Sequence, residues 1–334
     1  MPPEPPPHPL THRDRSTRLI LFGVLTVVFG GLSLALVPLM FMSLLAGPAA
    51  GGAGSRVATL IPGVMLYGGL GALLVTLGIG SILARRWARA LLLIGAWSTL
   101  AVGLVATVSL AFLLPTLARQ FMPPGGRQPP PGAVEAGLWG MLMGMGLLLV
   151  VVPALWVLVY GSRNVKATCE ARNPSPCWTD ACPLPVLAVA LWIAAGVPWM
   201  VLTPVLYRGV LLFFGMFISG PAGALGYLIL TVLWIVAAWW IYRLDLRGWW
   251  MLAVTLVVYG LSNILTYQRH SMAEMYALMG LLTPQVEALK GTSFMNWMTW
   301  MTAASTVATL VYLIAIRRYF SPHRSSSPHD GVSG

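Results

Sequence analysis

The apolar segment 249–267 carries polar side chains at a regular spacing. They recur every three or four positions, at Thr255, Tyr259, Ser262, Asn263, Thr266 and Tyr267. On a helix this spacing places all of them on one face, and His270 continues the line beyond the segment. The segment 294–316 repeats the arrangement with Thr302, Ser305, Thr306 and Thr309. These hydroxyl, phenol and carboxamide groups are uncharged, so their chemistry is hydrogen bonding to a neutral or weakly polar ligand.

Two such stripes on consecutive antiparallel helices predict that the helices face each other or share a crevice that opens outward. One interpretation is structural, since polar side chains hydrogen-bond between membrane helices at about 0.6 kcal/mol per contact. The other is functional, with a small neutral ligand held against Asn263 and the tyrosines. The candidate ligand-binding residues are Tyr259, Ser262, Asn263, Thr266, Tyr267, Thr302, Ser305, Thr306 and Thr309.

The three cysteines lie together in the polar stretch Gly161–Pro183. A zinc site needs four ligands, commonly with a close cysteine pair. Cys169, Cys177 and Cys182 are separated by seven and four residues, with no histidine nearby. Glu170 or Asp180 would have to complete such a site. The preferred interpretation is therefore reduced thiols in a cytoplasmic loop, with no bound metal.

The residues that other kinds of catalysis or cofactor binding require are absent from the apolar runs. All nine acidic residues and all five histidines lie in tails, loops or the ends of apolar runs. Proton relays and cation-coupled carriers need ionisable groups inside the membrane, and paired haem ligation needs histidines there. Phosphate-binding loops, HExxH and GxSxG motifs do not occur. The methionine cluster Met141, Met143 and Met145 is interpreted as helix packing beside Gly140 and Gly144, in preference to Cu(I) ligation. We expect a protein that is not an enzyme and has no cofactor.

Composition and charge define the class of protein. Apolar residues make up 57% of the 334 residues and charged residues only 9%, against about 25% charged in soluble domains. The net charge of +11 is typical of contact with anionic lipid headgroups. Basic patches interleaved with exposed aromatic residues are absent, so nucleic acid is not an expected partner. The expected partners are the lipid bilayer, its anionic headgroups and other membrane protein subunits.

Eight apolar runs are long enough to cross the hydrocarbon core as helices, which takes about 20 residues. The first ends at Ala46, and the others lie near 57–84, 89–114, 136–160, 184–207, 221–242, 249–267 and 294–316. Each run is continuously apolar, whereas barrel strands alternate. The predicted fold is an all-α polytopic membrane helix bundle of about eight transmembrane helices.

These runs divide the chain into five parts. The prediction is a disordered cytoplasmic tail at 1–17, a first four-span half at 18–160, a cytoplasmic connector at 161–183, a second four-span half at 184–318 and a disordered cytoplasmic tail at 319–334. With the N-terminus inside, fourteen of the twenty Arg and Lys residues fall on the inner side. This positive-inside asymmetry places both termini and the connector in the cytoplasm. The Arg-rich, Gly-, Ala- and Pro-rich composition is typical of a bacterial protein, and hence of an inner membrane.

Two further features concern the arrangement of the spans. Four spans on each side of the connector suggest that the halves are parallel repeats, since Arg85 and Arg89 align with Arg243 and Arg247. On the outer side, the run Gly209–Ser219 is too short to cross and is predicted to be interfacial or re-entrant.

Two hypotheses for function follow. The first is a non-catalytic subunit or scaffold of a membrane complex, favoured by the absence of buried ionisable groups. The second is a permease for a small neutral or lipid-like solute, favoured by the two polar stripes.

Overall fold

A computed structural model describes residues 15–46, 53–120, 132–280 and 294–320. The chain forms two compact units, residues 1–180 and 181–334. The predicted disordered tails, 1–17 and 319–334, lie almost wholly outside the described residues.

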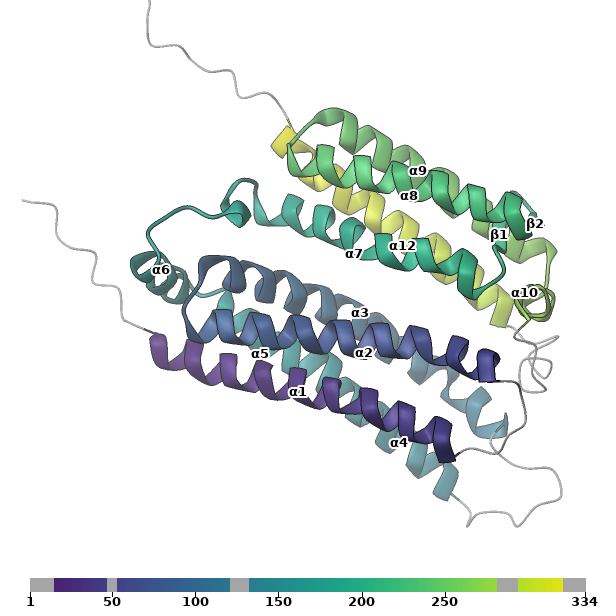
Figure 1. Ribbon diagram of the computed structural model, residues 1–334, viewed down its shortest axis with the longest axis horizontal. Coiled ribbons are helices and arrows are strands. Elements are labelled where there is room, and N and C mark those ends of the chain that lie inside the picture. Colours follow the sequence, from purple (N-terminus) through teal and green to yellow (C-terminus); the bar gives the residue numbers. More distant parts are fainter. Residues whose placement is uncertain (1–14, 47–52, 121–131, 281–293, 321–334) are drawn as a thin grey trace, which may run out of the picture. The chain divides into compact units, whose positions relative to one another are not determined.

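The described residues include eight helices that are long and apolar enough to cross a membrane (Figure 1). They are Ser16–Met42, Leu60–Ile82, Arg86–Leu114, Ala133–Tyr160, Leu184–Leu206, Gly220–Tyr242, Leu246–Arg269 and Asn296–Phe320. Each coincides with one of the predicted runs. The prediction of an all-α polytopic helix bundle is confirmed, and the protein is a multi-pass membrane protein.

In the first unit, α1 (Ser16–Ala46) and α2 (Ala53–Ile82) form a closely packed antiparallel hairpin (Figure 1). Gly23 faces Gly78, and Gly30 faces Gly71; a Cβ on any of the four would lie 2.7–2.9 Å from the carbonyl oxygen of the facing glycine. A seven-residue spacing returns each helix to the same face after two turns. The two backbones approach closely because these positions have no side chain, as small residues allow in membrane helix pairs.

The other helices of the first unit are α3 (Arg86–Gln120) and a span with an interruption. That span consists of α4 (Ala133–Gly146), a π-helical turn η1 (Leu147–Val151) and α5 (Val152–Tyr160). Pro153 has no amide hydrogen, so the carbonyl of Leu149 loses its usual helical donor, and this carbonyl lies against Gly103 of α3. Gly140 and Gly144, which the sequence suggests as a close-approach pair, face open space: a Cβ at either would meet nothing within 4 Å.

The connector folds onto the first unit as far as Asp180. Its helix α6 (Arg163–Arg172) and the short 3-10 turn η2 (Trp178–Asp180) follow α5. The amide of Asn173 donates to the carbonyl of Ala84 at 2.9 Å, and the Thr168 hydroxyl accepts from the backbone N–H of Arg15 at 3.2 Å. These bonds tie the connector to the α2–α3 turn and to the start of α1.

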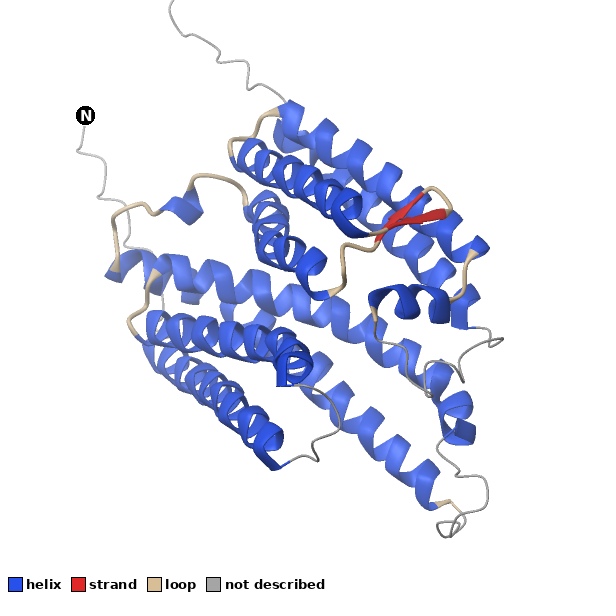
Figure 2. Cartoon of the chain, turned by 45° about the vertical axis from the view of Figure 1, so that its right-hand side comes forward, coloured by secondary structure: helices blue, strands red, loops and turns tan. Residues whose placement is uncertain are grey.

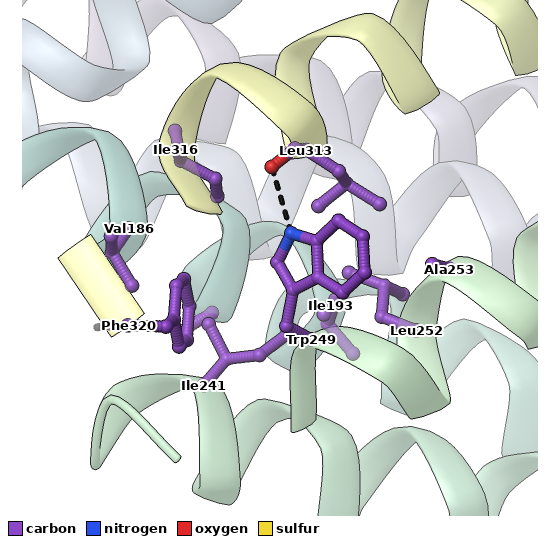
Figure 3. Packing of buried hydrophobic residues seen from close by; sticks show 10 residues of the cluster. Val186, Ile193, Ile241, Trp249, Leu252, Ala253, Leu313, Ile316 and Phe320 are labelled. Atoms are coloured by element: carbon purple, nitrogen blue, oxygen red, sulfur yellow. Dashed lines mark hydrogen bonds between the residues drawn. The ribbon is translucent and has the colours of Figure 1, made fainter. Parts of the chain in front are cut away.

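The second unit contains α7 (Leu184–Leu206), β1 (Leu211–Phe213), β2 (Met216–Ile218), α8 (Gly220–Tyr242), α9 (Leu246–Arg269), α10 (Met272–Met279), α12 (Phe294–Ile316) and the 3-10 turn η3 (Arg317–Phe320). Its apolar core joins α7, α8, α9, α12 and η3 around Trp249 (Figure 3). The Trp249 indole N–H donates to the Leu313 carbonyl at 2.7 Å. This bond satisfies a carbonyl in the last turn of α12, where helical donors run out.

The short run Gly209–Ser219, which the sequence predicts to be interfacial or re-entrant, contains a β-hairpin (Figure 2). Strands β1 and β2 are antiparallel, with Leu211 opposite Ile218 and Phe213 opposite Met216. The two residues between the strands, Phe214 and Gly215, have φ of 43° and 85°. Two left-handed residues in succession make the turn that matches the natural twist of a hairpin.

Candidate functional site: the polar face of helix α9

Helix α9 is well defined at both ends. The Asp245 side chain caps its start by accepting from the Arg247 backbone N–H at 2.9 Å, and the helix ends at Arg269. Its N-terminal half contributes Trp249 and Leu252 to the apolar core. In its C-terminal half three polar side chains are buried: Ser262 is 4% exposed, Asn263 7% and Thr266 1%.

The hydroxyls of Ser262 and Thr266 bind the backbone of the hairpin. Ser262 Oγ accepts from the N–H of Phe214 at 2.9 Å and donates to the carbonyl of Leu212 at 3.1 Å. Thr266 Oγ1 accepts from the N–H of Gly215 at 3.0 Å. Strands of three residues are too short to pair stably alone, so these three bonds fix the hairpin against α9.

His270 adds a contact at the end of the same face. Its Nε2 lies 3.1 Å from the Gly215 carbonyl oxygen, and its Nδ1 lies 2.9 Å from Glu274 Oε2. Both neighbours are acceptors, so the protonated ring, with an N–H on each nitrogen, satisfies both at once. The hydrogen bond from His270 lowers the pKa of Glu274 below its usual range, against a small opposing effect of burial.

A second group on this face consists of Tyr259, Asn263 and Tyr267, which make no bond to the hairpin. In the part of the chain that the structure describes, the buried side-chain polar atoms without a hydrogen-bond partner are Arg89 Nε and Thr107 Oγ1, and the Asn263 carboxamide is not among them. Tyr259, Asn263 and Tyr267 are spaced by four, so they lie one helical turn apart in a line. The hydroxyl of Tyr227, on α8, donates to the Val210 carbonyl at 3.1 Å. The predicted site thus divides into residues that hold the hairpin and residues that make no bond to it.

The predicted stripe on α12 bonds mainly to its own helix. Thr306 and Ser305 donate to the Thr302 carbonyl at 2.8 and 3.0 Å, and Thr309 donates to the Ser305 carbonyl at 2.8 Å. Thr306 lies against Gly260 of α9, whereas Ser305 and Thr309 are exposed on the surface of the unit. Of the four α12 residues, Thr306 is the one that the structure brings against α9.

A buried polar network in the first unit was not found from the sequence. The Tyr160 hydroxyl lies 2.7 Å from Ser81 Oγ, which donates to the Leu19 carbonyl at 3.1 Å. Nearby, the Trp156 indole N–H donates to Thr26 Oγ1 at 3.1 Å. These residues come from α1, α2 and α5. Trp156 and Tyr160 lie one turn apart on the same face of α5, but their partners Thr26 and Ser81 lie on other helices, so the pattern within one helix does not show which groups meet.

The connector holds ion pairs and thiols. Arg86 lies 3.2 Å from Asp180 and 3.8 Å from Glu170. Burial opposes ionisation of Asp180, but hydrogen bonds from Cys177 and the charge of Arg86 lower its pKa overall. Burial raises the pKa of Cys169 to about 11 and that of Cys182 to about 11.

Those two thiols stay protonated at neutral pH, whereas metal binding requires thiolate. Over the described ranges there is no group of three or more His, Cys, Asp and Glu side chains that could hold a metal ion.

Comparison of the chain with protein-family models, with curated proteins and with solved structures found no match. The assignment of function therefore depends on the site itself.

Proposed function

We propose that the protein is a non-catalytic subunit or scaffold of a membrane complex. The observation that carries this proposal is the anchored hairpin. Its backbone is bonded to α9 by Ser262 and Thr266, while three of its apolar side chains are exposed. Phe213 is 44% exposed, Phe214 40% and Met216 56%. A rigid backbone that presents apolar side chains is suited to docking against another membrane protein, because little conformational entropy is lost on binding.

The location proposed for the complex follows from the positive-inside asymmetry. We propose a bacterial inner membrane with both termini and the connector in the cytoplasm. The hairpin then faces the opposite side, where a partner's periplasmic or outer-leaflet surface would meet it.

Purification in a mild detergent tests the subunit role. A stoichiometric partner should copurify with the wild-type protein, and Met216→Ser should weaken its retention by removing an apolar contact from the hairpin. The matched control is Met143→Ser, because Met143 is equally an exposed methionine but lies on α4. A protein that purifies alone, or a partner lost equally from both variants, would contradict the proposal.

The second candidate is a permease for a small neutral or lipid-like solute. One observation favours it, namely that Tyr259, Asn263 and Tyr267 lie one turn apart on one face of α9 and make no bond to the hairpin. Flux of a labelled solute into proteoliposomes that contain the purified protein separates it from the subunit role.

A further inference from the structure

We propose that the second unit binds the phosphate group of one anionic phospholipid at Arg317, where α12 ends beside the start of α9. The Arg317 guanidinium carbon lies 5.2 Å from the ring centre of Trp249 and 5.7 Å from that of Trp250. A net positive charge attracts headgroups to many cations at once, whereas this site is defined by one guanidinium and two rings. It lies at the opposite end of α9 from the hairpin and is independent of the subunit role.

The two tryptophan rings hold the Arg317 guanidinium in place. Their planes are perpendicular and their centres are 4.8 Å apart. Trp249 is itself fixed, because its indole N–H donates to the Leu313 carbonyl at 2.7 Å (Figure 3). A guanidinium within about 6 Å of a ring centre is attracted to the ring. Such a contact supplies no hydrogen-bond acceptor, so the five N–H donors of the guanidinium still need partners.

The charge of Arg317 has no protein counter-ion in the described part of the second unit. That part contains two carboxylates, those of Asp245 and Glu274. The Glu274 carboxylate lies 2.9 Å from His270 at the far end of α9. The Asp245 carboxylate accepts from the Arg247 backbone N–H at 2.9 Å, and neither carboxylate forms an ion pair with Arg317. A negative charge for Arg317 therefore has to come from another molecule.

Cations outnumber carboxylates at this end of the second unit. The α8–α9 turn and η3 lie together there, because Ile241, Trp249 and Phe320 share the apolar core (Figure 3). The two segments and the first turn of α9 carry one carboxylate, Asp245, and four guanidinium groups, those of Arg243, Arg247, Arg317 and Arg318. The resulting positive potential favours a bound anion.

A phosphate group fits the donors that Arg317 offers. The guanidinium is planar and remains charged, and its N–H groups can bind two phosphate oxygens in parallel. The Arg317 side chain is exposed, so a headgroup reaches it without a change in the fold. A phosphodiester supplies the negative charge and the acceptor oxygens together.

The surroundings of Arg317 favour a lipid over a free phosphate ion. The Trp250 ring is 51% exposed, and the exposed side chains of Val254, Val258 and Leu261 continue its face of α9. Spacings of four, four and three residues keep all of them on one side of the helix. An acyl chain can lie along this apolar face while its headgroup meets Arg317, and tryptophan is common at the level of the headgroups. A free ion would use the guanidinium alone.

Native mass spectrometry of the delipidated full-length protein tests the site, with phosphatidylglycerol, phosphatidylcholine and inorganic phosphate as probes. The wild-type protein should retain one phosphatidylglycerol in preference to phosphatidylcholine, whose phosphate is compensated by its own cation. Arg317→Lys should lower that retention about tenfold, because lysine keeps the charge but loses the planar pair of donors. The matched control is Arg163→Lys, which changes an exposed arginine of α6 in the same way and should leave retention unchanged.

Trp250→Leu is the second variant, should Arg317→Lys fail to fold. It removes the exposed ring beside Arg317 and leaves the bond of Trp249 to Leu313 in place, and it should also lower phosphatidylglycerol retention.

Three results would overturn the proposal. Equal retention in the wild-type protein, Arg317→Lys and Trp250→Leu would mean that Arg317 is not the site, and equal losses in Arg317→Lys and Arg163→Lys would mean a general effect of the basic surface. Displacement of the lipid by inorganic phosphate would assign the site to a free ion. None of these results bears on partner copurification, so the subunit role stands or falls separately.

Discussion

Ser262 is bonded to the hairpin through both of its hydrogen-bonding roles. Its oxygen accepts from Phe214 and its hydroxyl hydrogen is directed to Leu212. Both backbone groups would be left without a partner if the hydroxyl were removed. The spacing of three and four residues predicted the helix face on which Ser262 lies. It could not show that Ser262 bonds to the hairpin whereas Asn263 does not. The reason is that the hairpin lies 48 residues earlier in the chain, and local periodicity contains no information about it.

Ser262→Ala should therefore lower the free energy of unfolding by about 1–3 kcal/mol, the usual cost of leaving a buried polar group unpaired. Chemical unfolding in detergent micelles measures this change. Ser305→Ala is the control, because the exposed Ser305 hydroxyl bonds to a carbonyl of its own helix, and it should change the free energy by less than about 0.5 kcal/mol. Equal losses in the two variants would mean that the hairpin bonds contribute nothing.

The pair formed by Glu274 and His270 predicts a dependence on pH. The pKa of Glu274 is lowered in the folded protein, so its ionised form stabilises the fold at pH values above the unfolded pKa of about 4.3. That contribution is lost as the pH falls through the lowered folded value. Glu274→Gln should flatten the fall in unfolding midpoint between about pH 5 and pH 3. The effect will be small because Glu274 is exposed. Identical profiles for the wild-type protein and the variant would refute it.

At the scale of elements, continuous apolar runs predicted the eight spans because a helix must satisfy its own backbone within lipid. The hairpin was harder to predict. Its turn is Phe214–Gly215, which lacks the Asn-Gly or Asp-Gly pair that marks such turns. The π-helical turn at Leu147–Val151 was missed as well, because Pro153 alone signals a kink but does not specify its form.

The glycine contacts between α1 and α2 predict different effects for two substitutions in α2. Gly71→Ala places a Cβ 2.9 Å from the Gly30 carbonyl oxygen and 2.7 Å from Leu34 Cγ, so the helices must separate. We expect a loss of about 1–3 kcal/mol, as for overpacking in general. Gly69→Ala, two residues away, meets nothing within 4 Å and should be neutral. The measurement is the unfolding midpoint of each variant. Equal midpoints for Gly71→Ala and Gly69→Ala would show that close packing is not the cause of the loss of stability.

At the scale of the whole molecule, the two units resemble each other at one turn. Ala84 and Leu244 both have left-handed φ, 52° and 58°, and each ends a helix just before Arg86–Gln120 or Leu246–Arg269 begins. In both turns the next amide reaches back to a carbonyl five residues earlier, Arg85 to Gly80 and Asp245 to Trp240. This match pairs Arg85 with Asp245, whereas the sequence alignment pairs Arg85 with Arg243, so the hypothesis of parallel repeats stays a prediction. Superposition of the two units, each taken alone, is the test of it.

Thiol labelling tests the predicted topology. Cys169 and Cys182 are buried and have raised pKa values, which leaves the half-buried Cys177 as the reactive thiol. A membrane-impermeant maleimide should modify the protein only after the cells are permeabilised, and Cys177→Ser should remove most of the signal. Modification in intact cells would place the connector outside and reverse the orientation of every span.

The anchoring of the hairpin also has a consequence for biogenesis. The Phe214 and Gly215 amides are synthesised 48 and 51 residues before the hydroxyls that receive them. Each nascent chain therefore passes through a stage in which α7 and α8 are available for insertion while the hairpin between them lacks its bonds to α9 and is held only from α8, through the bond of Tyr227 to Val210. The insertion machinery has to shield that segment, or leave it in water, until α9 arrives. Chains that stop short of Ser262 should be selectively degraded, because proteases can reach the segment that lacks these bonds.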